Sequence, residues 1–167
     1  IDAHADLRDE LDGEPYSHAC AIARSLDEGA LAVHKVGIRA YCRQEADLID
    51  SDDGIHTWFA RDIMSPCTGA KAWAEWLDSI AAIEGPVHLT IDIDGLDGSL
   101  VPATGTPVPG GLTFWHVVQT IETAFANCDV ISADVNEIVP QDDTPLTQFT
   151  AAMIATKVAA AHIAKMR

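Results

Sequence analysis

The sequence has 167 residues, of which 48% are hydrophobic, and this is enough for one compact domain with a sizeable core. Its 26 acidic residues outnumber 10 basic ones, which gives a formal net charge of -16. That charge disfavours a nucleic acid or an anionic membrane as partner and favours a cationic ligand or a metal ion, although a solvated acidic surface also accounts for part of it. No run of about 18 apolar residues is present, so no membrane span is predicted.

Strand-like and helix-like patterns alternate along the chain. Short apolar runs typical of buried strands are expected at residues 32–38, 55–59, 87–93 and 129–135. Helical periodicity is expected at residues 18–28, 43–49, 69–83, 114–126 and 147–165. This alternation predicts an α/β fold in which helices cover both faces of a parallel sheet.

The chain begins with polar side chains at every second position. A strand would point Asp2, His4 and Asp6 to the same side. Asp92 and Asp94 repeat this spacing at the end of the strand predicted at 87–93. A loop rich in Gly and Pro follows at 101–112, and loops after the carboxyl ends of parallel strands are where open α/β sheets place their sites.

These two groups of polar residues predict a metal site. Their four carboxylates would repel one another strongly unless divalent ions neutralised them. Hard oxygen ligands with few imidazoles and no thiolate suit Mn²⁺, and bridging carboxylates would let two ions share the five side chains. Such a site can activate water for hydrolysis. One Asp-x-Asp pair is a weak signal, since strand ends often carry Asp for structural reasons, but two such motifs together favour the metal.

Four segments of the sequence resemble the ureohydrolase family, which includes arginase, agmatinase, guanidinobutyrase and formimidoylglutamase. They occur in order as DAHADLRDE, PYSHAC, LTIDIDGLDGSLVPATGTPVPGGL and SADVNEIVP. The resemblance covers nearly the whole chain, and DLRDE with PYSHAC is most similar to the agmatinase branch. It implies a three-layer αβα sandwich with a parallel sheet, of which residues 1–167 would be the C-terminal part of a single ureohydrolase domain.

The resemblance also implies roles for the metal-binding residues. Asp2 and Asp92 would bridge two Mn²⁺ ions. Asp6 would bind the first ion and contact the bridging hydroxide, while His4 and Asp94 would bind the second ion. The family has a further histidine ligand upstream of DAHxD, and this sequence has no residues there. Since the chain does not begin with methionine, we expect residues before it to be missing.

Two further residues match positions that act on the substrate in the family. His18 matches a proton-shuttling histidine, a role suited to the side chain whose charge changes near physiological pH. Glu137 matches the acid that pairs with the substrate guanidinium. One departure is Gly98, which stands where the family usually has proline after the second aspartate motif.

The function implied is hydrolysis of a small cationic guanidino compound with release of urea. The acidic balance favours agmatine, which would give putrescine, but guanidinobutyrase, arginase or formimidoylglutamase activity stays open. A related deacetylase shares the fold but holds one catalytic metal and lacks the full set of DAHxD plus DxD, so these residues argue against it. A non-catalytic metal-binding family member also stays open. Family members are commonly trimers or hexamers, so we expect a homo-oligomer, with no nucleic acid or membrane partner.

The other candidate residues are expected to be structural. His88 lies within an apolar strand, where a hydrogen-bonded histidine is commoner than a metal ligand. Arg39 is expected to form a structural ion pair, and Trp73 and Trp76, three apart on one helix, are expected in the core or at a subunit contact. Scattered cysteines without zinc-site spacing indicate free thiols in a reducing compartment, and we expect a cytoplasmic protein. They are Cys20, Cys42, Cys67 and Cys128.

Overall fold

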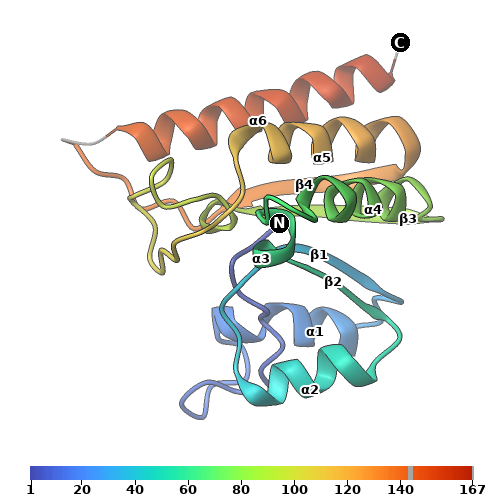
Figure 1. Ribbon diagram of the computed structural model, residues 1–167, viewed down its shortest axis with the longest axis vertical. Helices are drawn as coiled ribbons and strands as arrows, with labels where there is room; N and C mark the ends of the chain where they lie inside the picture. Colours follow the sequence, from blue (N-terminus) through green and yellow to red (C-terminus); the bar gives the residue numbers. More distant parts are fainter. Residues whose placement is uncertain (143–144, 167) are drawn as a thin grey trace.

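The computed structural model describes residues 1–142 and 145–166 and confirms the predicted alternation (Figure 1). Its strands are β1 (Val33–Ile38), β2 (Ile55–Phe59), β3 (Pro86–Asp92) and β4 (Asp129–Asn136). Its helices are α1 (Ala21–Asp27), α2 (Arg43–Ser51), α3 (Ala60–Ile63), α4 (Gly69–Ala81), α5 (Phe114–Asn127) and α6 (Leu146–Lys165), with 3-10 turns η1 (His18–Cys20) and η2 (Ile93–Gly95). Each predicted strand lies within one residue of the observed bounds. The sequence pattern missed α3 and η2, which are too short to show a period.

The strands form two parallel pairs, β1 with β2 and β3 with β4, and the first residues of the chain join them. The Ile1 nitrogen donates to the Thr90 carbonyl of β3 at 3.0 Å, and the Asp92 amide donates back to the Ile1 carbonyl at 2.9 Å. On the other side, the Asp2 amide donates to the Val36 carbonyl of β1 at 3.1 Å. The N-terminal segment therefore lies between β1 and β3.

Helices form layers around these strands (Figure 1). α1 and α2 cover one face of the β1–β2 pair through a small apolar cluster, while α3 and α4 contact the opposite face. α5 and α6 pack against β4 and against each other. This arrangement confirms the α/β class with helices on two sides of parallel strands. Within the residues that the structure describes, no helix is both long and apolar enough to cross a membrane.

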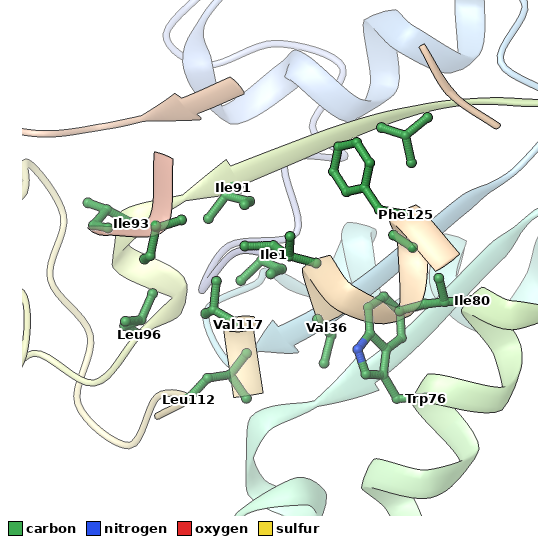
Figure 2. Packing of buried hydrophobic residues seen from close by; sticks show 14 of the residues in the cluster. Ile1, Val36, Trp76, Ile80, Ile91, Ile93, Leu96, Leu112, Val117 and Phe125 are labelled. Carbon is green, nitrogen blue, oxygen red and sulfur yellow. The ribbon is translucent and has the colours of Figure 1, made fainter. Parts of the chain in front are cut away.

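The main core lies between the strands and α4, α5 and α6, as Figure 2 shows. Ile91 of β3 and Val117 and Ile121 of α5 are fully buried in it. Trp76 is also buried, and its indole Nε1 donates to Thr120 Oγ1 at 3.0 Å, so its polar atom is satisfied. The core position predicted for Trp76 is confirmed, and Trp73 packs against the same cluster.

His88 has the structural role expected from its place in a strand. Its Nε2 lies 3.0 Å from Asp134 Oδ2, and its Nδ1 lies 2.7 Å from Ser132 Oγ on the neighbouring strand β4. All four cysteines are free thiols, as the sequence spacing predicts. Neither the His88 network nor the thiols lie among the residues that converge at the predicted metal site.

Candidate metal centre

The N-terminal segment delivers its polar side chains to one side, but not as a regular strand. Burial alternates as predicted: Ile1, Ala3, Ala5 and Leu7 are buried, while the polar residues between them are partly exposed. After its hydrogen bonds to β3 and β1, the segment pairs through an isolated bridge between His4 and Ala40, just beyond β1, and then turns at Asp6. Buried and exposed side chains still alternate because the backbone stays extended between β3 and β1, which it contacts in turn.

The structure brings the first motif against the second. His4 Nδ1 lies 3.1 Å from Asp94 Oδ2 and 3.6 Å from Asp2 Oδ1. One ligand atom each from Asp2, His4 and Asp94 lies within 4.8 Å of the others, which is close enough for a single ion to contact all three. Metal binding by these residues stays a prediction, but their convergence is a property of the fold.

The turn after β3 fixes the second motif. The Asp92 carboxylate accepts a hydrogen bond from the Asp94 amide at 2.9 Å and so caps η2. Asp94 is buried, and its Oδ1 accepts from the Ala3 amide at 3.1 Å while its Oδ2 accepts from Thr106 Oγ1 at 3.1 Å. Asp94 thus ties the N-terminal segment, the β3 turn and the Gly-rich and Pro-rich loop together.

Asp6 reaches the site from a left-handed backbone conformation. Its φ is 54°, which is uncommon for a residue other than glycine. The Asp6 carbonyl accepts hydrogen bonds from the amides of Ile22 and Ala23, both at 3.1 Å, so the first turn of α1 holds it. The Asp6 side chain lines a cavity together with His4.

The charges of this cluster are unbalanced without a cation. Hydrogen bonds to Asp2 and Asp94 raise the pKa of His4 to about 10. Burial and the nearby carboxylates of Asp2 and Asp94 raise the pKa of Asp92 to about 9, and burial with repulsion from Asp2 raises that of Asp6 to about 7. Burial would also raise the pKa of Asp94, but the hydrogen bonds from His4 and the Ala3 amide outweigh it.

These residues fit a divalent metal ion. In the metal-free protein, the negative charge of the carboxylates is offset by protons on Asp6 and Asp92 and by the His4 imidazolium. A divalent cation could replace these protons, since metal ligands bind in their deprotonated forms. The donor set of carboxylates with a single imidazole matches hard ions such as Mn²⁺ better than a thiolate-bound zinc. The geometry of the described residues thus agrees with the chemistry that the sequence predicts.

The cavity beside the cluster also receives His18. It has a volume of about 290 Å³, and its walls include His4, Asp6, His18 and Thr106. His18 begins η1 and is exposed, so its ring is open to a molecule that enters. A larger hollow of about 460 Å³ lies between β4 and α6, but its walls are mostly apolar and it contains none of the converging residues. We therefore place the candidate active site in the smaller cavity.

Glu137 is not among the residues that line this cavity. It follows β4 with a φ of 58° and is exposed. Its Oε2 lies 3.5 Å from the point that a Cβ on Gly105 would occupy, so it stands beside the loop that carries Thr106. Its predicted pairing with a guanidinium stays a prediction.

Arg39 has a role that the sequence reasoning missed. Among the described residues the predicted ion pair is not found: the guanidinium instead donates to the carbonyls of Asp94 at 2.8 Å and Leu96 at 3.2 Å and to that of Val108. Arg39 thereby holds the β3 turn and the Gly-rich and Pro-rich loop beside the end of β1. Burial lowers its pKa. The sequence carried no signal for this role beyond an arginine at a strand end, since backbone carbonyls are present at every residue.

Comparisons with known proteins give a family match over nearly the whole chain. A family model described as the arginase family matches residues 1–161. N(1)-aminopropylagmatine ureohydrolase from Synechocystis sp. is 36% identical over 160 residues, which make up 95% of this chain and 49% of the relative. Agmatinase from Pyrococcus horikoshii is 35% identical over 154 residues, or 92% of this chain and 51% of the relative. The chain therefore spans about half the length of these curated relatives.

Solved structures share the fold. Agmatine ureohydrolase of Thermoplasma volcanium has a TM-score of 0.81 with 26% identity, covering 96% of this chain and 53% of that one. Arginase from Medicago truncatula has a TM-score of 0.76 with 28% identity, covering 95% of this chain and 48% of that one. These matches confirm the predicted arginase-like α/β architecture. Because the family model covers nearly the whole sequence, the chain belongs to the arginase family.

Proposed function

We propose that the protein hydrolyses a linear guanidino compound and releases urea, with agmatine as the substrate and putrescine as the other product. The observation that carries this proposal is the convergence of Asp2, His4 and Asp94 beside a cavity that His18 also lines. Relatives named agmatinase and N(1)-aminopropylagmatine ureohydrolase support the same reaction class.

Five side chains would hold two Mn²⁺ ions: the converging Asp2, His4 and Asp94, together with Asp6 and Asp92. When bound, such ions lower the pKa of water and supply a nucleophile near neutral pH. The carboxylates can hold metal ions only if their geometry is fixed. The hydrogen bonds from the Ala3 amide and from Thr106 hold the Asp94 carboxylate in place. Thr106 also faces the cavity, so it links the metal ligands to the wall that a substrate would contact.

His18 and Glu137 would act on the substrate rather than on the metal. The exposed ring of His18 is placed to donate a proton to the amine that leaves as the C–N bond breaks. Glu137 stands beside the loop of Gly105 and would pair with the guanidinium through charge-assisted hydrogen bonds. The net charge of -16 would attract a cationic substrate to the site.

The cavity mouth favours a substrate with an amine at its far end. Leu11 lines the cavity within a loop whose acidic side chains are exposed. The one arginine in the cavity wall, Arg8, has its Nε 3.8 Å from Glu45 Oε2, so its charge is already balanced. Among the described residues of this wall, a carboxylate tail would find no cation without a carboxylate partner, whereas an ammonium tail would lie near several carboxylates. The exposed acids of the loop are Asp9, Glu10, Asp12 and Glu14.

Urea release tests this proposal directly. Agmatine, arginine and 4-guanidinobutyrate are supplied in parallel to the protein at its natural full length, with Mn²⁺ or with a chelator. We expect urea from agmatine, lost with the chelator and restored by Mn²⁺. The His18→Gln variant should lower turnover by about 10²- to 10⁴-fold without changing the metal content, while His162→Gln, at the far end of α6, should match the parent. No urea from any substrate despite bound Mn²⁺ would contradict the proposal.

A further inference from the structure

The peptide groups on both sides of Asp6 are held by two buried, oppositely charged side chains. The ammonium of Lys35 donates to the Ala5 carbonyl, which precedes Asp6. The Leu7 amide, which follows Asp6, donates to Glu45 Oε1 at 3.1 Å. Both bonds are buried, and Asp6 between them has its left-handed φ of 54°.

Lys35 is an unusual residue for its position. It is 5% exposed on β1, next to the apolar cluster that contains Leu7 and Ile38. Among the residues that the structure describes it makes no ion pair within 4.0 Å, so its charge is not cancelled by a direct partner. Burial lowers the pKa of Lys35 to about 8, while the carboxylates of Asp2, Asp6 and Glu45 oppose that shift. A buried cation of this kind is costly, and a methionine would fill the same space without that cost.

Glu45 holds the other side of the turn. It is 3% exposed, and both of its oxygens are used: Oε1 accepts from Leu7 and Oε2 accepts from the Cys42 amide at 2.7 Å. Cys42 is the residue that caps the start of α2. Glu45 therefore ties the Asp6 turn to the first turn of a helix, and a shift of one would require a shift of the other.

We propose that Lys35 and Glu45 are positioning residues, which clamp the backbone around Asp6 so that its carboxylate stays directed at the metal centre. The inference rests on the proposed metal site, since it assigns these two residues to the placement of one ligand. The clamp is chemically specific: a cation holds the carbonyl before Asp6, and an anion holds the amide after it. The first turn of α1 holds the Asp6 carbonyl itself, and this leaves the turn little freedom.

The two charges make the proposal testable, because their electrostatic effects on a metal ion have opposite signs. If charge alone mattered, Lys35→Met would strengthen Mn²⁺ binding by removing a nearby cation, and Glu45→Gln would weaken it by removing an anion. If the clamp positions Asp6, both variants must weaken binding. We expect each to lower Mn²⁺ affinity about 10- to 100-fold, the usual effect of losing a residue that orients a ligand.

The experiment measures Mn²⁺ binding by calorimetry and hydrogen exchange by mass spectrometry, on the protein at its natural full length. Lys165→Met and Glu75→Gln are matched controls. Lys165 also donates to a backbone carbonyl, that of Cys128, but at the other end of the molecule, and Glu75 is an exposed acid on α4. Both controls should bind Mn²⁺ as the parent does.

Hydrogen exchange separates failure of the clamp from failure of the metal proposal. Without any metal, both clamp variants should exchange at least tenfold faster in the peptide spanning residues 3–9, while α5 keeps its protection and so reports an intact fold. Tighter Mn²⁺ binding by Lys35→Met, or unchanged exchange at 3–9 in both variants, would overturn the clamp. A parent that binds no Mn²⁺ but shows the expected exchange would refute the metal centre and leave the clamp standing.

Discussion

His4 Nδ1 lies 3.1 Å from Asp94 Oδ2, although the two residues come from opposite halves of the polar cluster and are far apart in the sequence. The contact exists because the N-terminal segment runs between β1 and β3, with Ile1 bonded to β3 and Asp2 bonded to β1. The candidate site is therefore a tertiary feature, and its integrity depends on how this segment is held as much as on the ligands themselves.

Replacing Asp92 by asparagine should separate metal binding from folding. Without metal, the folded chain keeps a proton on Asp92 up to its pKa of about 9, whereas the unfolded chain loses that proton near its ordinary value of 3.8. Stability of the metal-free parent therefore falls as pH rises between these values. Asparagine removes this loss of stability, so metal-free Asp92→Asn should melt a few °C higher than the parent at pH 7.

The same variant should lose Mn²⁺-dependent turnover, because an amide cannot replace a bridging carboxylate. Thermal melts with a chelator, together with urea assays with Mn²⁺, measure the two effects on one preparation. Normal turnover by Asp92→Asn would remove this residue from the proposed metal centre.

Metal binding should release protons. At pH 7 the metal-free site holds protons on His4, with a pKa of about 10, and on Asp92, with a pKa of about 9, and partly on Asp6, with a pKa of about 7. All three must be deprotonated to act as ligands, so Mn²⁺ affinity should rise with pH between about 6.5 and 8.5. Calorimetry in buffers of different ionisation enthalpy counts the protons released. A binding heat that does not depend on the buffer would contradict the assignment.

The sequence was sufficient for the strands because their signals are local. β2 has the bounds that its apolar run predicts, and the period of two at the N-terminus correctly separates the buried from the polar positions. The family resemblance is likewise visible in the sequence alone, since its motifs occur in order and cover both halves of the polar cluster.

Other features of the site could not be predicted in this way because they depend on tertiary contacts. The left-handed turn at Asp6 contains no glycine, so the sequence does not predict it. Its stability comes from α1 and from buried side chains distant in sequence. The role of Arg39 depends on carbonyls that reach it only after the loop of Val108 folds over β1. Such backbone acceptors are identical at every residue, so the sequence carries no mark of them.

Arg39→Met should destabilise the protein by leaving loop carbonyls without a donor. The variant keeps the apolar stem but loses the hydrogen bonds to Asp94, Leu96 and Val108. We expect a loss of about 1–3 kcal/mol in the free energy of unfolding, since partly buried carbonyls are left unpaired. Arg43→Met is the control: it breaks only the exposed pair with Asp47 and should cost less than about 0.5 kcal/mol. Urea denaturation measures both, and equal midpoints for the two variants would show that the Arg39 bonds contribute little.

Two nearby glycines differ in how closely the N-terminal segment approaches them. A Cβ on Gly95 would lie 2.8 Å from the Asp2 amide nitrogen and 2.9 Å from Ile1 Cγ2, whereas a Cβ on Gly98 would meet no atom within 4 Å. Gly95→Ala must therefore push the segment that carries Asp2 and His4 away from the β3 turn. Gly98→Ala adds a methyl group in open space at a backbone conformation that alanine can adopt.

We expect Gly95→Ala to cost about 1–3 kcal/mol of stability and to weaken Mn²⁺ binding at least about tenfold, because overpacking displaces ligands as well as backbone. Gly98→Ala should change stability by less than about 1 kcal/mol and leave Mn²⁺ binding unchanged. Chemical denaturation and calorimetric titration of both variants provide the comparison. If Gly95→Ala bound Mn²⁺ as tightly as Gly98→Ala, the ligands of the N-terminal segment would not need their close contact with the turn after β3, and a metal site formed between these two segments would lose its structural basis.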